Sequence, residues 1–262
     1  MSHTIKRYGW IPDLPDQRDY LYASPYAASV ALPSSVDLRS SCPPVYDQGQ
    51  LGSCTANAIA AAIDFERAKQ GLKFITPSRL FIYYNERVIE NSVPDDAGAE
   101  IRDGIKSIVK QGACPESDWP YVETKFADTP PTKCFAEAVK YEALSYSRVL
   151  GSTHASLAYH LKHCIAVLER PVVLGATLFD SFESDEVAKT GIVPMPGPNE
   201  QEVGGHAFCV VGYDDAKQVF ICRNSWNTDW GMKGYFTMPY AYILDTDLVN
   251  DMWTILMEEA TS

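Results

Sequence analysis

One cysteine of this 262-residue chain stands where a nucleophile could be activated. Cys54 lies at the junction between a polar, glycine-containing stretch at residues 47–53 and an alanine-rich segment that we expect to be helical. The first turn of a helix has unpaired N–H groups and the positive end of the helix dipole. This setting favours a thiolate, which is the nucleophilic form. A buried structural cysteine is the alternative interpretation.

A histidine and an asparagine form a second candidate pair, far along the sequence. Two apolar stretches flank a polar turn at residues 214–217, and this pattern predicts an antiparallel hairpin. If the hairpin is centred on Asp215, His206 lies opposite Asn224 and both side chains point to one face. A carboxamide oxygen beside an imidazole would orient the ring as an acid or base. A core histidine at a strand end is the alternative.

Helices and strands divide the chain into two halves that must position these residues. Helical patterns fill the first half, and strand patterns follow Pro171. Thr76 is the expected N-cap of the second helix, with Pro77 as its first residue. The order predicts an α+β protein whose two lobes meet along a cleft. Helices are expected at 55–70, 76–86, 101–111 and 156–170, and strands at 172–178, 206–213, 218–223, 234–238 and 252–257.

Residues 1–32 have a different composition, rich in proline, aspartate and aromatic side chains. They carry no sustained period, but their aromatic content argues against disorder. We expect an extended arm that packs onto a globular domain at residues 33–262. The arm could cover the functional residues or brace the far side of the domain. Its aromatic residues include Tyr8, Trp10, Tyr20, Tyr22 and Tyr26.

The net charge of −12 excludes some classes of partner. So acidic a chain offers no basic patch for nucleic acid or for an anionic membrane. No apolar run is long enough to span a bilayer, and the first twenty residues contain no signal-peptide core. We therefore expect a monomer that is cytoplasmic or exported by a route that needs no signal peptide.

Seven cysteines leave at least one free thiol in a monomer. No two of them form a C-x-x-C motif. Cys42, Cys114 and Cys134 lie in loop-like sequence and could form one disulfide. His160 and His163 have helical spacing, but no further ligand residue accompanies them, so we expect no metal and no cofactor.

The order of Cys54, His206 and Asn224 resembles the papain-like cysteine peptidase family. Gln48 stands six residues before the cysteine, where that family has its oxyanion-hole glutamine. The likeness covers about residues 33–262. The segments that carry it are Val36-Asp37-Leu38-Arg39, Gly52-Ser53-Cys54, Gly205-His206-Ala207, Val211-Gly212-Tyr213, Asn224-Ser225-Trp226, Trp230-Gly231 and Gly234-Tyr235.

The resemblance implies a papain-like fold, with a helical N-terminal lobe, an antiparallel β-rich C-terminal lobe and the active-site cleft between them. It also implies hydrolysis of peptide bonds through an acyl-enzyme intermediate. Cys54 would be the thiolate nucleophile, and His206 the general acid and base. Asn224 would orient the histidine, and Gln48 would stabilise the oxyanion.

Two further residues are implied by the resemblance, and two positions depart from it. Trp226 would shield the bond between the histidine and the asparagine from water, and Gly98 would bind the substrate backbone. Leu51 replaces a cysteine that the family uses in a disulfide, and Thr55 replaces an aromatic residue. Short-armed bacterial members of the family are the most similar, and a bacterial origin is expected.

Peptides or proteins are the substrates that the resemblance implies. The arm at residues 1–32 stands in place of the family's long inhibitory propeptide, so it is a candidate for intramolecular contact with the cleft. Two other classes stay open. One is a Cys-His enzyme that acts as a transamidase or deamidase. The other is a non-catalytic peptide-binding module that has kept the fold.

Overall fold

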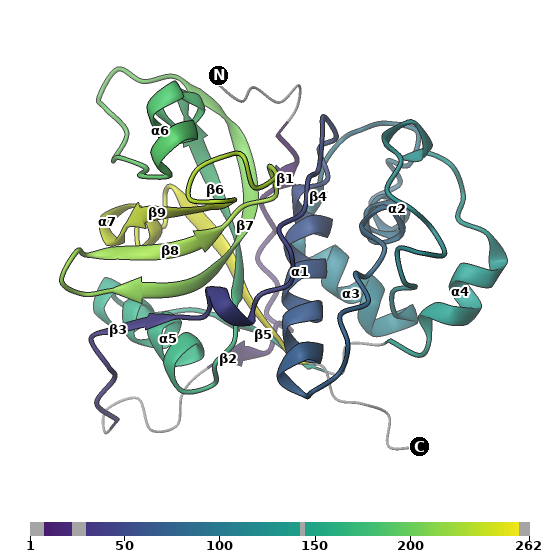
Figure 1. Ribbon diagram of the computed structural model, residues 1–262, viewed down its shortest axis with the longest axis horizontal. Helices are drawn as coiled ribbons and strands as arrows, with labels where there is room; N and C mark the ends of the chain where they lie inside the picture. Colours follow the sequence, from purple (N-terminus) through teal and green to yellow (C-terminus); the bar gives the residue numbers. More distant parts are fainter. Residues whose placement is uncertain (1–7, 23–29, 142–144, 257–262) are drawn as a thin grey trace.

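Helix α1 (Cys54–Lys69) runs between a large sheet and a group of shorter helices (Figure 1). The computed structural model describes residues 8–22, 30–141 and 145–256. Every side chain of α1 from Cys54 to Glu66 is buried. The sequence pattern indicated only one buried face, but alanine lets neighbours approach closely on every side. The helix that begins at the candidate nucleophile is therefore held by both lobes.

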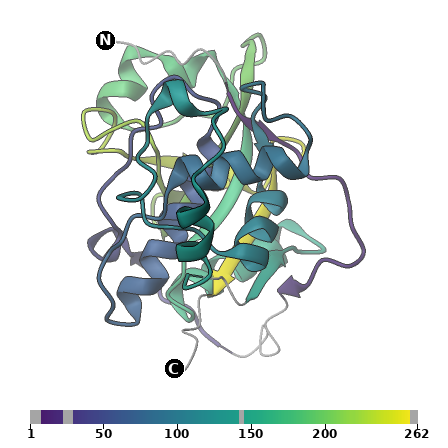
Figure 2. The ribbon, with the colours of Figure 1, turned by 90° about the vertical axis from the view of Figure 1, so that its right-hand side faces the viewer.

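The helical lobe lies on one side of α1 and turns its outer surface to the viewer in Figure 2. Its second helix begins later than expected, because Thr76 has a φ of 44° and Ser78 caps the helix by accepting from Phe81 N. The third helix has the expected bounds and ends at Gly112, whose φ is 73°. The lobe contains α2 (Arg79–Ile89), β4 (Ala99–Glu100), α3 (Ile101–Gln111), η2 (Glu123–Lys125) and α4 (Thr132–Ala138). The short helix η1 (Arg39–Ser41) lies instead beside the sheet, with Arg39 over the ring of Tyr235.

The β-rich lobe is an eight-stranded sheet with the order β2-β5-β10-β6-β7-β8-β9, and β3 pairs with β7. All its pairings are antiparallel except that of β2 with β5. The strands are β2 (Leu21–Tyr22), β3 (Ser35–Asp37), β5 (Ser145–Val149), β6 (Val172–Phe179), β7 (Glu202–Asp214), β8 (Val219–Arg223), β9 (Tyr235–Pro239) and β10 (Val249–Leu256). Its helices are α5 (His154–Ala166), η3 (Asp180–Glu183), α6 (Asp185–Thr190) and α7 (Tyr240–Ile243). The α+β, two-lobe prediction is confirmed.

The hairpin of β7 and β8 corrects the expected register. Tyr213 pairs with Phe220, and Cys209 pairs with Arg223, with an irregularity between Val210 and Gly212. Continued toward the open end, away from the turn, the observed pairing would set residue 224 opposite residue 208 rather than opposite His206. The error is three residues near the turn and, past the irregularity, two residues at the open end, so His206 and Asn224 still point to the same face.

The described part of the N-terminal arm touches both lobes. Strand β1 (Trp10–Ile11) pairs in parallel with β4 of the helical lobe. Strand β2 pairs in parallel with β5 of the other lobe. Figure 1 shows the purple arm passing behind α1, between the sheet and the helices. The aromatic packing expected for the arm is seen at Trp10, which is buried, but not at Tyr20, which is 72% exposed, and Tyr26 lies outside the described residues.

All seven cysteines are free thiols. Cys114 and Cys134 lie in one buried cluster of the helical lobe, whereas Cys42 packs elsewhere and donates to Leu38 O. Within the described residues, no helix is long and apolar enough to cross a membrane.

Candidate active site

The loop before α1 is held rigidly from both of its sides. Gly52 N donates to Asp96 Oδ1 at 3.0 Å, and Ser53 Oγ bonds to Tyr121 Oη at 2.6 Å. Just after Cys54, Thr55 Oγ1 donates to the buried carboxylate of Glu86 at 2.9 Å. These contacts surround Cys54, the first residue of the helix, so its sulfur has a fixed position.

The sulfur of Cys54 is fully buried. Burial raises the pKa of the Cys54 thiol to about 12. Hydrogen bonds from the backbone of Ala207, Gly9 and Thr55 lower the pKa of the thiol, but by less than burial raises it. The sequence favoured a thiolate at this helix terminus, but in this structure loss of water outweighs the helix dipole. Ala207 follows His206 in the chain, so its contact with the sulfur places the histidine segment next to the nucleophile.

His206 and Asn224 meet at the open end of the hairpin, as the sequence predicted. His206 Nε2 and Asn224 Oδ1 are 2.8 Å apart, and both residues are buried. Asn224 Oδ1 also accepts from Ser225 N at 2.8 Å, which identifies it as the acceptor. The proton of a neutral imidazole therefore sits on Nε2, and Nδ1 is the basic nitrogen.

Gln48 is joined to the same region through Ser225. Ser225 Oγ donates to Gln48 Oε1 at 2.7 Å, and Gln48 N donates to Ser225 O at 2.9 Å. One Nε2 proton of Gln48 is donated to Leu51 O at 3.0 Å. An amide NH₂ has two protons, so the second remains for another acceptor. The loop before Cys54 and the segment after Asn224 are thus locked together.

Trp226 covers the histidine with an aromatic face. Its ring centroid lies 5.2 Å from that of His206, with 38° between the ring planes. Phe182 and Trp230 pack on Trp226 with centroid distances of 5.3 Å and 5.2 Å. Only 1% of Trp226 is exposed, so its contact with the histidine ring lies in the interior of the protein.

The arm crosses these residues at Tyr8 and Gly9. The ring of Tyr8 meets His206 edge to face at 6.0 Å, and Tyr8 Oη donates to Glu183 Oε1 at 2.7 Å. Gly9 O accepts from Ala99 N at 2.7 Å. Gly98, the expected backbone-binding residue, lies directly beside Gly9, and a Cβ built on Gly98 would be 2.3 Å from Gly9 O.

The fold and these side chains together define a papain-like cysteine protease. The model of the family described as papain family cysteine protease matches residues 32–247, and the chain belongs to that family. Its structure is similar to xylellain, a cysteine protease from Xylella fastidiosa, with 43% identity and a TM-score of 0.88. The match covers 98% of this chain and all of xylellain.

Two further relatives are similar to this chain at different identities and over different shares of their own length. An uncharacterized peptidase C1-like protein of Acanthamoeba polyphaga mimivirus is 42% identical over 97% of this chain and 88% of its own length. Cysteine proteinase 2 of Entamoeba histolytica is 26% identical over 80% of this chain. The chain spans 64% of that Entamoeba protein.

The residues singled out in the sequence occupy one region, at the point where α1, β7 and the end of β8 meet. The sequence had indicated that the arm could cover this region, but it did not show which residues of the arm, or which partners, make the contacts. Gly9 was not singled out, and neither was Asp251 of β10, which accepts from Trp10 Nε1 at 3.1 Å. Nothing local marks such partners, because they lie 241 positions apart in the chain.

Proposed function

We propose that the chain hydrolyses peptide bonds through a Cys54 acyl-enzyme. The observation that carries the proposal is the 2.8 Å contact between His206 and Asn224, beside a sulfur that faces Ala207 N. Nδ1 of His206 takes the thiol proton, and the sulfur attacks the scissile carbonyl carbon. His206 then protonates the leaving amine, and a water that it deprotonates releases the acid from the thioester.

Gln48 is the proposed side-chain donor to the oxyanion, together with Cys54 N–H. The proposal is supported by the second Nε2 proton of Gln48 and by the rigid loop that joins the two residues. Preorganised donors of this kind stabilise the negative charge of the tetrahedral intermediate. Asn224 acts as a positioning residue, and Trp226 keeps its bond to His206 dry.

The test removes the sulfur and keeps a matched cysteine variant as control. Cys54→Ala should abolish cleavage of a peptide mixture, whereas Cys42→Ala should leave it unchanged because Cys42 packs elsewhere. A peptidyl epoxide should add once, and peptide mapping should find the adduct on Cys54. Near-normal cleavage by the Cys54→Ala chain would refute the mechanism.

Two alternatives give different products. A transamidase would transfer the acyl group to an added amine in preference to water, which mass spectrometry of the products would reveal. A non-catalytic peptide-binding module would bind peptides without forming an epoxide adduct. A binding module has no need of Gln48, Cys54, His206 and Asn224 together, and the Asn224-Ser225-Trp226 segment disfavours a transamidase, so we favour the hydrolase.

We further propose that residues 1–32 are an inhibitory arm on a peptidase domain at 33–262. The proposal is supported by Gly9, whose carbonyl pairs with Ala99 N and whose N–H points at the Cys54 sulfur. Tyr8 covers the ring of His206. A substrate would have to displace both residues to reach the sulfur. A purely structural brace would leave the nucleophile open.

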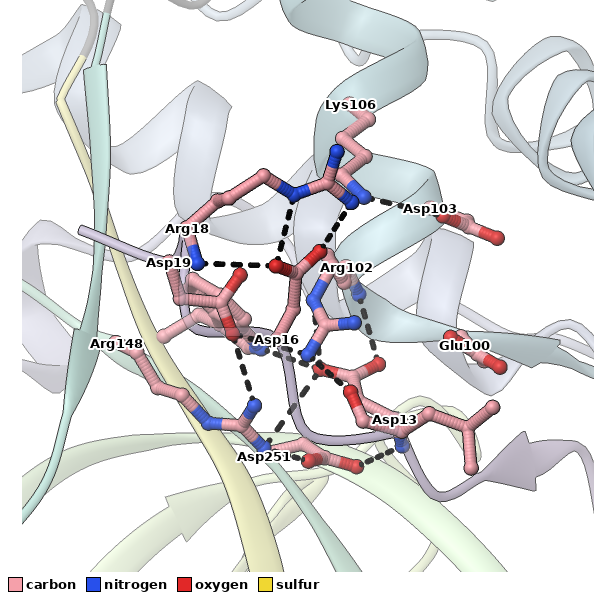
Figure 3. A network of polar contacts seen from close by, with 12 residues as sticks. Asp13, Asp16, Arg18, Asp19, Glu100, Arg102, Asp103, Lys106, Arg148 and Asp251 are labelled. Atoms are coloured by element: carbon pink, nitrogen blue, oxygen red, sulfur yellow. Dashed lines mark hydrogen bonds and ion pairs between the residues drawn. The ribbon is translucent and has the colours of Figure 1, made fainter. Parts of the chain in front are cut away.

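A network of charged side chains anchors the arm away from the sulfur (Figure 3). Asp19 accepts from Arg102 at 2.9 Å and from Arg148 at 3.1 Å. Asp13 Oδ2 accepts from Trp253 Nε1 at 3.0 Å, and Asp13 is buried.

The direct test of the inhibitory arm compares the full chain with a folded form that starts at Pro33, by measuring kcat/KM on one peptide. Inhibition predicts a gain in the shorter form, which added arm peptide reverses. Equal activity, or a loss accompanied by lower thermal stability, would identify a brace.

A further inference from the structure

The hydroxyl of Tyr121 joins the two ends of the loop that precedes the nucleophile. Tyr121 Oη donates to Gln48 O at 2.8 Å, and it lies 2.6 Å from Ser53 Oγ. A tyrosine hydroxyl has a single proton. Because the carbonyl oxygen can only accept that proton, Ser53 Oγ is the donor to Tyr121 Oη. One side chain of the helical lobe therefore holds residue 48 and residue 53 at the same time.

Ser53 can make this bond because its side chain does not cap helix α1. It occupies the N-cap position, but its hydroxyl lies against Tyr121 and Asn57 and makes no cap bond within the described residues. A serine in that position usually accepts from the N–H of the second or third helical residue. Here the backbone of the second residue, Thr55, bonds to the Cys54 sulfur and lowers the pKa of the thiol. The Ser53 hydroxyl thus holds the loop, and the helix terminus faces the sulfur.

The hydrogen bonds run in one direction, from a buried cation to the backbone of Gln48. Arg79 Nη1 donates to Asn57 Oδ1 at 3.0 Å, and Asn57 Nδ2 donates to Ser53 Oγ at 3.1 Å. Ser53 then donates to Tyr121, and Tyr121 donates to Gln48 O. Hydrogen bonds in such a series polarise and strengthen one another. The position of Gln48 O depends on the whole series, and Tyr121 is its last donor.

Arg79 also holds the ring of Tyr121. Its guanidinium carbon lies 4.1 Å from the ring centroid, within the range of a cation–π contact. Glu116 accepts from Arg79 Nε at 2.8 Å and from Nη2 at 2.7 Å. Asp47 O accepts from Nη1 at 2.8 Å. A cation that is itself held by three bonds therefore fixes the ring, while two further bonds fix the hydroxyl.

We infer that Tyr121 is a positioning residue for the oxyanion hole, which fixes the Gln48 side chain relative to Cys54 N–H. Gln48 carries one donor, and the peptide bond from Ser53 to Cys54 carries the other. Ser225 O of the β-rich lobe accepts from Gln48 N at 2.9 Å, so with Tyr121 both polar backbone groups of Gln48 are held. Donors that are placed in advance stabilise the developing charge best. This inference rests on the proposed peptidase function, because it concerns the donors of the same site.

A purely structural link between the helical lobe and the loop is the competing role. Such a link would support every property of Cys54 equally, including reactions of the sulfur that build no oxyanion. The contacts favour positioning, because the Tyr121 hydroxyl bonds to residues 48 and 53 themselves. Glu123, on the same segment, instead accepts from Gln50 N at 3.2 Å, at a residue that carries neither donor.

The test is Tyr121→Phe in the full chain, which removes the hydroxyl and keeps the ring beside Arg79. On a peptide, kcat should fall about tenfold, less than the loss of a whole donor costs, while KM changes little because the donors act in the transition state. The rate at which iodoacetamide alkylates Cys54 should stay the same. In that reaction iodide leaves a saturated carbon as the C–S bond forms, so no oxyanion develops.

Two variants are controls for the loss of a hydrogen bond in this lobe. Tyr84→Phe removes an exposed bond to Thr129 Oγ1 at 3.1 Å, away from the nucleophile loop. Glu123→Ala removes the bond from Gln50 N, which links the same segment to the same loop. Both variants should keep kcat and the alkylation rate. If Glu123→Ala lowers kcat as much as Tyr121→Phe, or if Tyr121→Phe slows cleavage and alkylation equally, the tyrosine is only a structural link.

A double variant tests whether the tyrosine acts through the glutamine. When Gln48 is already alanine, Tyr121→Phe should lower kcat much less than it does in the unmodified chain, because the side-chain donor that it positions is gone. Losses that simply multiply would overturn the inference. An active chain whose kcat is unchanged by Tyr121→Phe would also overturn it and leave the peptidase proposal intact. An unmodified chain that cleaves no peptide would refute the peptidase proposal, and the inference with it.

Discussion

Gly9 of the arm and Gly52 of the loop before the nucleophile lie in contact. A Cβ on Gly9 would be only 1.8 Å from Gly52 O, a separation that no real side chain could adopt. Gly52 is held in place, because its N–H donates to Asp96. The contact therefore makes the position of the arm over Cys54 sensitive to a single methyl group.

Gly9→Ala in the full chain should displace the arm at the nucleophile. Under the inhibitory hypothesis, kcat/KM on a peptide should rise severalfold, and iodoacetamide should alkylate Cys54 faster at pH 7. The second effect follows because burial, which raises the pKa of the Cys54 thiol to about 12, would be relieved. Gly197→Ala is the control, since a Cβ there meets nothing nearer than 3.8 Å. Unchanged alkylation would show that the arm does not cover the sulfur.

Gln48→Ala should lower kcat by roughly 10²-fold, the usual loss when one oxyanion donor is removed. Its effect on KM should be small, because the donor acts mainly in the transition state. The substitution also removes the bond from Ser225 Oγ, so Ser225→Ala separates the two effects. If Ser225→Ala costs as much as Gln48→Ala, the glutamine is structural.

Asn224→Ala should be milder than Gln48→Ala, because His206 can still reach the sulfur. The loss of the Nε2 contact should shift the limb of the kcat/KM pH profile that reports the histidine. Asn250→Ala, at an exposed position of β10, is the matched control. A parallel fall in activity at every pH would point to a general loss of structure.

Local sequence signals predicted part of the fold well. The third helix was bounded correctly because its isoleucines keep a strict helical period and Gly112 supplies the left-handed end. The second helix was predicted to begin at Pro77, but Thr76 takes a positive φ that no local pattern reveals. The capping box at Thr153 and Ser156 also places the start of α5 earlier than its apolar period indicated.

The sequence predicted those features of the candidate site that depend on which face of a strand a side chain points to, but not those that depend on the exact register of the strands. The hairpin error of two residues left His206 and Asn224 together because strand faces repeat with period two. The bond of Trp10 to Asp251 could not be predicted, since it depends on the register shift of β10 and joins residues 241 positions apart. The elevated pKa of Cys54 could not be predicted either, because it follows from burial by segments that are far apart in the sequence.

The last prediction concerns stability against pH. Burial, followed by the charge of Asp13, raises the pKa of Asp251 from 3.8 to about 7. Burial, with the charges of Asp103 and Glu100, raises the pKa of Glu90 from 4.5 to about 7. At intermediate pH these carboxyls hold protons in the folded chain that they release on unfolding. Their stabilising contribution is therefore complete below about pH 4 and is lost as the pH rises through about 7.

The midpoint of thermal unfolding should thus be a few degrees lower at pH 8 than at pH 5. Glu90→Gln should reduce that difference, because the amide stays neutral and can still accept from Glu100 N, which lies 2.8 Å from Glu90 Oε1. Glu202→Gln, at an exposed position, should leave the difference as it is. Arg39 lowers the pKa of Asp37, and Lys217 lowers the pKa of Asp214. The stability that these two carboxylates contribute is lost only as the pH falls into the acid range, so it does not change between pH 5 and pH 8. A midpoint that rises from pH 5 to pH 8 in the unmodified chain would contradict the direction of the Glu90 and Asp251 shifts.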